Sequence, residues 1–470
     1  MIAVLSHFSM QQGGQTMSEE ASRSPVSGQS MTEGSLWRKI LLFSIPLMLS
    51  QILQVLFNMA DVAVVGRFAS ASALGSVGST TTLVTLFTGF LIGMGSGVNV
   101  IVARHLGARD QWAVRESVHT ALLVCLLTGL IICGLCLALA PGMLELLNTK
   151  PDLLAGAVQY FRIYALGMPA LGIFNFGNAV LSANGDTRRP LLYLTIAGVL
   201  NVALNLFFVI VCGMAGDGVA LASIISQYLS ALLVLIHMLR QKDSCALHPR
   251  QIRFYPGRAK ALVGLGLPAG VQNAIFAVAN LFIQAGVNSF DSLMVAGNAA
   301  AANADSLIYN VMAAFYTGCS TFMGQNLGAG KRDRVLKSYL ISVAYSFAAG
   351  AVLGLLLVTF GNQFLSLFTA DPAVADAGMQ RIRIMGYSYA FSAFMDCTIA
   401  ASRGLGKSFG PTVIVILGSC VFRVVWVYTV FAYFHTIPSL YLLYIFSWVL
   451  TAIAEIIFFA ASYKRTVIVA

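Results

Sequence analysis

The sequence predicts an all-α integral membrane protein whose twelve transmembrane helices form two six-helix bundles. Three observations predict this class: a very apolar composition, a series of apolar segments long enough to cross a bilayer, and an internal repeat. Apolar residues make up 58% of the 470 residues and charged residues only 10%, and the mean hydropathy is +0.81. A water-soluble protein of this composition would have too little polar surface to cover itself, so lipid is the expected solvent.

Twelve apolar segments are each long enough for a membrane-spanning helix, which needs about 20 residues. Helices are the expected form, because at this segment length only they satisfy all backbone polar groups internally within hydrocarbon. The expected spans are residues 40–65, 74–102, 117–140, 155–182, 190–212, 218–239, 261–288, 294–327, 338–368, 376–402, 411–434 and 440–462.

Lysine and arginine lie almost entirely on one side of the predicted membrane. With both termini placed in the cytoplasm, 22 of the 28 basic residues fall on the cytoplasmic side, and two, Arg67 and Lys150, fall on the outer side. The remaining four lie within spans: Arg162, Arg381, Arg383 and Arg423. This positive-inside pattern orients a multi-pass protein in the cytoplasmic (inner) membrane of the cell. The net charge of +10 therefore reflects topology, and nucleic acid is not an expected partner.

Three blocks of the first half of the chain recur in the second half. One of them is "VARHLGARD" at 102–110, which matches "MGQNLGAGK" at 323–331. The other matching segments are 162–190 with 383–411, and 44–68 with 266–290. The first two pairs share the same offset along the chain, and the third differs from it by a single position, which aligns Pro46 with Pro268. Agreement in three separated blocks predicts a duplication.

Each repeat contains six predicted spans, so both halves enter the membrane from the same side. Parallel repeats of this kind are typical of secondary transporters, in which the substrate site lies between the halves and one half rocks against the other. A duplicated bundle could also serve as a channel or a scaffold. The predicted parts are a disordered cytoplasmic arm (1–34), an N-terminal six-helix lobe (35–240), a cytoplasmic interlobe linker (241–258) and a C-terminal six-helix lobe (259–465).

The first predicted helix reads "IPLMLSQILQVLFNMADVAVVGRF" and is followed by "LGARD" and "LSANGDTRRP". Together with the two-fold repeat, over residues 36–465, these motifs resemble the multidrug and toxic compound extrusion (MATE) family of cation-coupled exporters. The resemblance implies a V-shaped pair of lobes that exports amphiphilic, often cationic organic compounds in exchange for inward H⁺ or Na⁺. We expect an antiporter rather than an enzyme, working as a monomer in contact with membrane lipid, with no cofactor besides the coupling ion.

Asp61 is the leading candidate for the residue that carries the coupling ion. Removal from water favours its protonated form, and no Lys or Arg lies at helical spacing from it except Arg67 near the outer end of the helix. By resemblance, Asp61, Asn201, Asn205 and Ser223 match the cation-site positions of the family. Some relatives carry an acid where this chain has Asn205, so one negative charge is missing, which favours protons over sodium. The alternative role of Asp61 is a structural hydrogen bond within the N-terminal lobe.

Further polar residues inside the spans are candidates of lower rank. By resemblance, Asn58, Asn175 and Asn178 match polar positions of the substrate cavity, although amides also commonly join membrane helices to each other. Asp305 and Asp396 are secondary ion-coupling candidates in the C-terminal half, and Arg423 is expected to neutralise one of them if their role is structural. No catalytic residue or metal ligand set is expected, because the His residues are dispersed and the Cys residues are expected to pack as apolar side chains.

The alternative function is a lipid-linked oligosaccharide flippase of the same superfamily. A cavity that holds an anionic phosphate would suit Arg side chains, whereas the first and fifth predicted helices of this N-terminal lobe offer one Asp and several Asn. An ATP-driven pump is not expected, because the loops leave no room for a nucleotide-binding domain. The only similarity to a phosphate-binding loop is "GKS" at 406–408, and it has Ala401 where such a loop requires glycine.

Overall fold

The computed structural model describes residues 31–468, and this part of the chain contains helices and loops but no strand. The predicted disordered arm, residues 1–34, lies outside the described residues except for its last four. The described helices form twelve successive rods: α2 (Leu36–Phe68), α3 (Ala71–Gly107), α4 (Gln111–Leu146), α5 (Pro151–Ala165) with α6 (Met168–Ala183), α7 (Arg188–Leu206) with η1 (Phe207–Val211), α8 (Gly216–Arg240), α9 (Pro256–Val287), α10 (Ser292–Gly328), α11 (Arg332–Leu365), α12 (Pro372–Gly404), α13 (Phe409–Val415) with η3 (Ile416–Val421), α14 (Phe422–Trp426), η4 (Val427–Phe431) and α15 (Ala432–Phe434), and α16 (Ile437–Tyr463) with η5 (Lys464–Ile468). The predicted all-α class is confirmed.

Most of these rods have the length and composition of membrane spans. Among the described residues, nine helices are long and apolar enough to cross a membrane, and the bent pair of α5 and α6 makes a tenth. The other two rods are α10 and α12, which are 37 and 33 residues long but less apolar. Much of their length is buried against neighbouring helices, so fewer of their residues need to be compatible with lipid.

The predicted spans agree with the helices apart from their ends. Most helices extend several residues beyond the prediction, because their ends continue past the apolar segment. The ninth span was predicted too far along the chain: α11 ends at Leu365, so residues 366–368 lie outside it. The fourth span is broken between α5 and α6 by a bend of 44°. Pro169 in α6 cannot donate a backbone hydrogen bond, whereas its repeat equivalent in the continuous α12 is Ala390.

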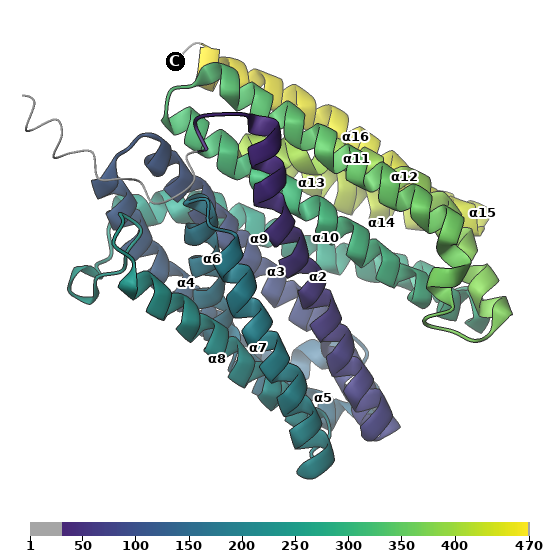
Figure 1. The fold of residues 1–470 in the computed structure, drawn as a ribbon. Coiled ribbons are helices and arrows are strands. Elements are labelled where there is room, and N and C mark those ends of the chain that lie inside the picture. The colour runs from purple at the N-terminus through teal and green to yellow at the C-terminus, as the bar shows by residue number, and fades with distance from the viewer. Residues whose placement is uncertain (1–30, 469–470) are drawn as a thin grey trace, which may run out of the picture.

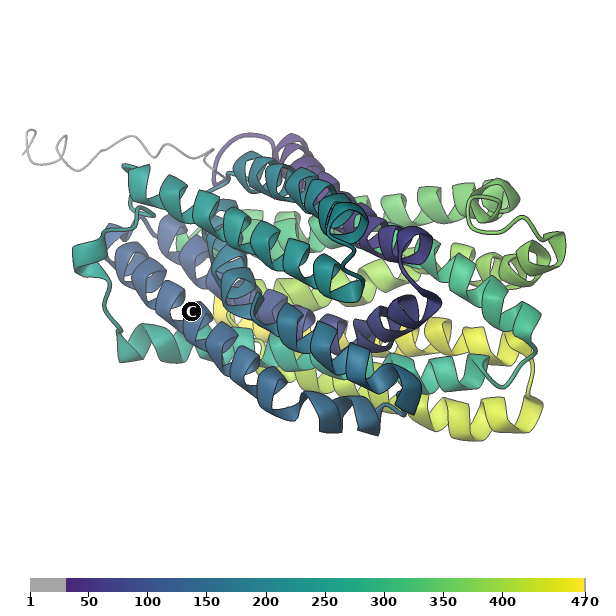
Figure 2. The same cartoon turned by 90° about the horizontal axis from the view of Figure 1, so that it is seen from below.

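The two halves form two groups of helices that meet at one end and diverge at the other (Figure 1). We call α2 to α8 the N-lobe and α9 to α16 the C-lobe. Seen from below, the blue helices lie mostly toward one side of the molecule and the light-green and yellow helices mostly toward the other (Figure 2). The lobes meet at the end that carries most of the Lys and Arg residues, which we call the basic end. The segment that joins the lobes also lies there, and it includes the short helix η2 (Pro249–Gln251).

The first helix of each lobe crosses over to pack on the other lobe. In α2, Phe43 stacks edge-on against Phe322 of α10, with ring centroids 5.5 Å apart, and Ser44 Oγ donates to Ala314 O at 3.4 Å. In α9, Ala259 packs in a small cluster with Met94 of α3. The repeat equivalence of α2 and α9 therefore extends to their packing, and each lobe is held to the other by its first helix.

Two pairs of glycines bring α3 of the N-lobe and α9 of the C-lobe into direct contact. A Cβ added to Gly93 would lie 2.4 Å from Gly270 N, and one added to Gly97 would lie 2.5 Å from Gly266 N. No real Cβ tolerates such distances, so only glycine allows the two backbones to approach this closely. In both helices the two glycines are four residues apart, a small-residue spacing that is typical of closely packed membrane helices.

Candidate functional site

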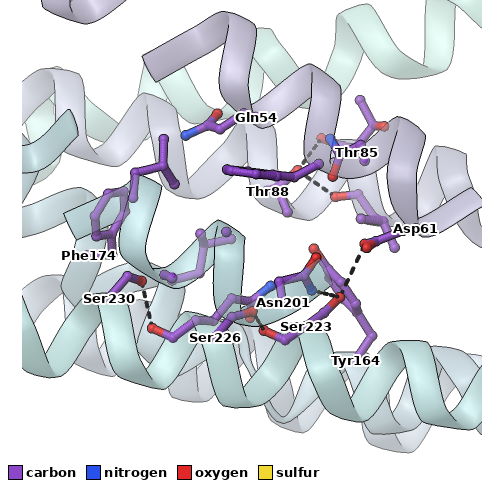
Figure 3. Close-up of a pocket in the computed structure, with 18 of the residues that line it drawn as sticks. Gln54, Asp61, Thr85, Thr88, Tyr164, Phe174, Asn201, Ser223, Ser226 and Ser230 are labelled. Atoms are coloured by element: carbon purple, nitrogen blue, oxygen red, sulfur yellow. Dashed lines mark hydrogen bonds between the residues drawn. The ribbon is translucent and has the colours of Figure 1, made fainter. Parts of the chain in front are cut away.

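A cavity of about 320 Å³ lies inside the N-lobe, among α2, α3, α5, α6, α7 and α8 (Figure 3). Its lining residues are Gln54, Phe57, Asn58, Asp61, Val62, Val77, Thr80, Thr81, Val84, Thr85, Thr88, Ile92, Tyr160, Tyr164, Leu171, Phe174, Asn175, Leu194, Ala197, Gly198, Asn201, Ser223, Ser226, Gln227 and Ser230. Hydroxyl, amide and carboxylate side chains line it together with apolar and aromatic ones, so the cavity offers an organic molecule both hydrogen bonds and apolar contacts.

Asp61 is the only charged side chain among these lining residues. It lies on α2, between Asn205 of α7 and Ser223 of α8. Asn205 Nδ2 donates to Asp61 Oδ1 at 2.5 Å, and Ser223 Oγ donates to Asp61 Oδ2 at 3.3 Å. One carboxylate therefore accepts hydrogen bonds from two other helices (Figure 3 shows the bond from Ser223).

The amides of α7 extend this network. Asn201 and Asn205 lie one turn apart on the same face, and Asn205 Nδ2 also lies 3.3 Å from Asn201 Oδ1. Asn201 Nδ2 in turn donates to Ser223 Oγ at 3.4 Å. The structure thus brings together the four residues that the resemblance assigned to the cation site. Asn201, Asn205 and Ser223 are all buried.

Two local features distinguish this part of α7. Asn205 Oδ1 is buried and has no hydrogen-bond partner among the described residues, so the amide that donates to Asp61 also has an acceptor oxygen available. Immediately after Asn205, the helix widens into the π-helical turn η1. A similar π-turn, η4, lies within one position of the repeat-equivalent place in the C-lobe. π-Helical turns are rare in proteins overall, and those that occur often lie at functional sites.

Of the three asparagines predicted to line the substrate cavity, two do so and one does not. Asn58 and Asn175 line the cavity, and Asn175 Nδ2 donates to Leu171 O within its own helix at 2.9 Å. Asn178 lies one turn closer to the basic end and is not among the lining residues. Its Oδ1 accepts a long hydrogen bond of 3.5 Å from Ser182 Oγ.

Sequence reasoning missed a row of threonines that forms one wall of the cavity. Thr81, Thr85 and Thr88 follow each other at helical spacing on α3 and line the cavity. The hydroxyl of Thr85 donates to Thr81 O at 2.8 Å, and that of Thr88 donates to Val84 O at 2.7 Å. Their lone pairs remain available to a bound molecule. Hydroxyls at spacings of three and four residues in an otherwise apolar helix were a signal that could have revealed this wall.

The acid Asp305 of the C-lobe belongs to a separate buried network. Asp305 on α10 forms an ion pair with Arg381 of α12 and accepts a hydrogen bond from Tyr389. Arg381 also donates to Asn298, which accepts from Tyr441 Oη at 2.6 Å. The cation that neutralises Asp305 is therefore Arg381 and not Arg423. Sequence spacing did not indicate this pair, because its two members lie far apart in the chain, on different helices.

Asp396 lies further toward the basic end of α12. The positive charges of Arg423 and Arg403 act on this carboxyl group, but no ion pair within 4.0 Å involves Asp396 in the part of the chain that the structure describes. Arg423 instead donates to Ser447 Oγ at 3.1 Å and lies over the ring of Tyr444, 4.6 Å from its centroid. The cavity that holds Asp61 therefore includes neither of the secondary acids.

A family model described as MatE matches the chain twice, over residues 46–207 and 268–429. The two matches begin at the repeat-equivalent prolines Pro46 and Pro268, and together they cover more than half of the chain. The chain belongs to the MatE family. The two matched segments correspond to the predicted duplication, so this MatE protein carries one copy of the family unit in each lobe.

Relatives of this MatE protein match most of its length. The probable multidrug resistance protein YpnP of Bacillus subtilis is 30% identical over 369 residues, which cover 78% of this chain and 82% of that protein. The probable multidrug resistance protein YoeA of the same organism is 26% identical over 411 residues, covering 84% and 87%. A solved MOP superfamily transporter from Pyrococcus furiosus has a TM-score of 0.88 at 20% identity, covering 94% of this chain and 99% of that one. This last similarity shows a shared fold.

Proposed function

We propose that the protein exports amphiphilic, cationic organic compounds across the inner membrane, driven by the inward movement of H⁺ or Na⁺. The observation that carries this proposal is the position of Asp61, a lone acid in a cavity otherwise lined by hydroxyls, amides and apolar side chains. An organic cation and a coupling cation would compete for the same carboxylate. The names of the relatives YpnP and YoeA, both probable multidrug resistance proteins, support the same activity.

The hydrogen bonds of Asp61 provide a physical basis for coupling. An ionised carboxylate accepts from both Asn205 and Ser223, and so links α2 to α7 and α8. Protonation turns one of the two carboxylate oxygens into a neutral hydroxyl. This hydroxyl donates a hydrogen bond and is a weaker acceptor than the ionised oxygen was. Loading a proton would therefore weaken one of the two links and change how α2 packs against its neighbours. Alternating access requires such a difference between the loaded and the empty states.

Sodium could occupy the same place. Oxygen atoms of Asp61, Asn201, Asn205 and Ser223 lie within one hydrogen-bonded network, and carboxylate, amide and hydroxyl oxygens are suitable ligands for a hard cation. The set has only one formal negative charge, which favours a proton over sodium. We therefore rank H⁺ first, and the experiment below separates the two ions.

The cavity lining favours an exporter over a lipid-linked oligosaccharide flippase. Such a substrate carries anionic phosphates, which proteins bind with Arg and Lys side chains. None of the residues that line the N-lobe cavity is an Arg, Lys or His. An anionic phosphate next to Asp61 would experience repulsion, whereas an organic cation would be attracted.

Reconstitution of the full chain in liposomes tests this function. Vesicles would be loaded with a fluorescent organic cation such as ethidium, and either a pH gradient or a sodium gradient would be imposed. We expect gradient-driven movement of the dye with one of the two ions. Movement of a lipid-linked oligosaccharide without a gradient, with no dye transport under either gradient, would overturn the proposal in favour of the flippase.

We further propose that the basic end faces the cytoplasm, as the distribution of Lys and Arg predicts. The lobes meet at this end and diverge at the other, so the described conformation would then be open to the outside. Labelling of a cysteine introduced in place of the exposed Arg109 tests this orientation, in a Cys212→Ser background because Cys212 is itself exposed at the opposite end of the molecule. A membrane-impermeant maleimide should reach it only after the cells are opened, and reaction in intact cells would reverse the orientation.

A further inference from the structure

A second cavity, of about 250 Å³, lies at the basic end, between the start of α4 and the segment that joins the lobes. It is lined by Trp112, Arg115, Glu116, His119, Arg250, Gln251, Arg253 and Tyr255. It is separate from the Asp61 cavity, with which it shares no lining residue.

Three arginines give this cavity an uncompensated positive charge. Its single acid, Glu116, is already engaged, since it accepts from Arg258 Nε at 3.0 Å and from Trp112 Nε1 at 2.8 Å. Among the described residues, none of the ion pairs within 4.0 Å involves Arg115, Arg250 or Arg253. Arg115 Nε is moreover buried without a hydrogen-bond partner. Buried N–H donors in proteins almost always have an acceptor, and a bound anion would be one for Arg115 Nε.

The joining segment is tied to α4 on both sides of the cavity. His119 Nε2 accepts from His248 N at 3.0 Å, while His119 Nδ1 donates to Arg115 O at 2.7 Å. Tyr255 N donates to Thr120 Oγ1 at 3.3 Å. The ring of His119 and these backbone contacts hold the joining segment, with its two arginines, opposite Arg115. The cavity is therefore built by the fold and is not a chance gathering of surface charges.

Exposed apolar side chains flank the cavity on the same surface. Trp112 is 66% exposed, and Phe254 and Ile252 on the joining segment are 50% and 37% exposed. Residues 111–116 directly precede the apolar part of α4, which places them at the depth of the lipid headgroups. Aromatic residues beside arginines at this depth are typical of contacts with the membrane interface.

We propose that this cavity binds a phosphate group of an anionic ligand, which Arg115, Arg250 and Arg253 contact together. Guanidinium groups bind phosphate oxygens through paired hydrogen bonds, and three of them converge here. The phosphate can belong to an anionic lipid headgroup or to a soluble phosphate compound. A ligand in this place would bridge α4 of the N-lobe and the segment that leads to the C-lobe.

The test uses the purified full chain in detergent and measures its melting temperature during titration. Short-chain phosphatidylglycerol is the lipid arm, phosphatidylcholine is the lipid without net charge, and inorganic phosphate is the soluble arm. We expect saturable stabilisation by phosphatidylglycerol or by phosphate, and none by phosphatidylcholine. The arm that saturates at the lower concentration identifies the source of the phosphate.

Charge-matched variants separate a built site from general surface charge. Arg250→Gln with Arg253→Gln should weaken the binding about 25-fold, at roughly fivefold for each lost arginine near a membrane surface. The control replaces two exposed basic residues outside the cavity, Arg240→Gln with Lys337→Gln, and should leave the binding unchanged. Equal losses in both double variants, or no stabilisation by either anion, would overturn the proposal.

Discussion

Gly107 and Gly328 occupy repeat-equivalent positions, and each packs against the backbone of the other's helix. A Cβ added to Gly107 would lie 1.9 Å from Gln325 O, and one added to Gly328 would lie 1.9 Å from Arg104 O. Arg104 and Gln325 are themselves repeat equivalents, so the contact is reciprocal. Such a contact is expected where a two-fold axis relates two copies of one unit. The axis passes through the closed basic end, where α3 and α10 meet.

The first prediction concerns this closed end. Gly107→Ala or Gly328→Ala should force α3 and α10 apart, because the added methyl group has only backbone atoms to displace. Overpacking of this kind costs about 1–3 kcal/mol, which corresponds to a roughly 5- to 150-fold shift toward the state open at this end. Hydrogen–deuterium exchange of peptides covering residues 99–107 and 321–328 should become faster, and by symmetry the two variants should behave alike.

The matched control for these variants is Gly264→Ala. Gly264 lies on α9 near the same interface, but a Cβ there would meet no atom within 4 Å. Exchange at the closed end should therefore equal that of the unmodified protein. Unchanged exchange in Gly107→Ala would show that the contact does not hold the lobes together.

The second prediction concerns Asp61→Asn. This change keeps the shape of the side chain but removes the charge that binds the coupling ion. Gradient-driven dye transport should fall to the level of empty liposomes, whereas the free energy of unfolding should change by only about 1 kcal/mol through one altered hydrogen bond. Asp152→Asn, at an exposed acid in the first turn of α5, is the control and should transport normally. Parental transport rates in Asp61→Asn would remove this carboxylate from the mechanism.

The third prediction separates protons from sodium. Asn205→Asp places a second carboxylate within hydrogen-bond distance of Asp61. Two such charges repel each other unless a cation lies between them, and added ligand charge strengthens cation binding. Dye transport, which we expect H⁺ to drive in the unmodified protein, should therefore gain a dependence on sodium in Asn205→Asp. Asn205→Leu removes the donor without adding charge and should show no gain in sodium dependence. An unaltered sodium response in Asn205→Asp would place the ion elsewhere.

The sequence alone predicted the features that depend on local composition. Apolar segment length locates the helices, and the offset between repeated blocks locates the two lobes. Asn201 and Asn205 could be placed on one face of a helix because they are one helical turn apart. Their approach to Asp61, which lies several helices earlier in the chain, came only from resemblance to a family, since no local pattern records which helices become neighbours.

The sequence did not predict the features that depend on packing between helices far apart in the chain. The crossing of α2 and α9 between lobes requires knowing which apolar faces pair, and apolar side chains occur on every face of both helices. The ion pair of Asp305 with Arg381 was missed for the same reason, and Arg423 was considered in its place. The break at Pro169 was visible as a proline within a predicted span, but its effect depends on whether neighbouring groups satisfy the freed backbone.

The fourth prediction distinguishes the network around Asp305 from the site around Asp61. Removing one partner of a buried ion pair leaves a charge without compensation, at a cost of about 3–5 kcal/mol. Asp305→Asn or Arg381→Gln alone should therefore lower the melting temperature strongly, and the double variant should recover much of the loss. Arg383→Gln, at an exposed arginine two positions away, should have little effect on stability. The opposite pattern, with normal melting of Asp305→Asn and lost transport per folded molecule, would instead make Asp305 a second ion-coupling residue.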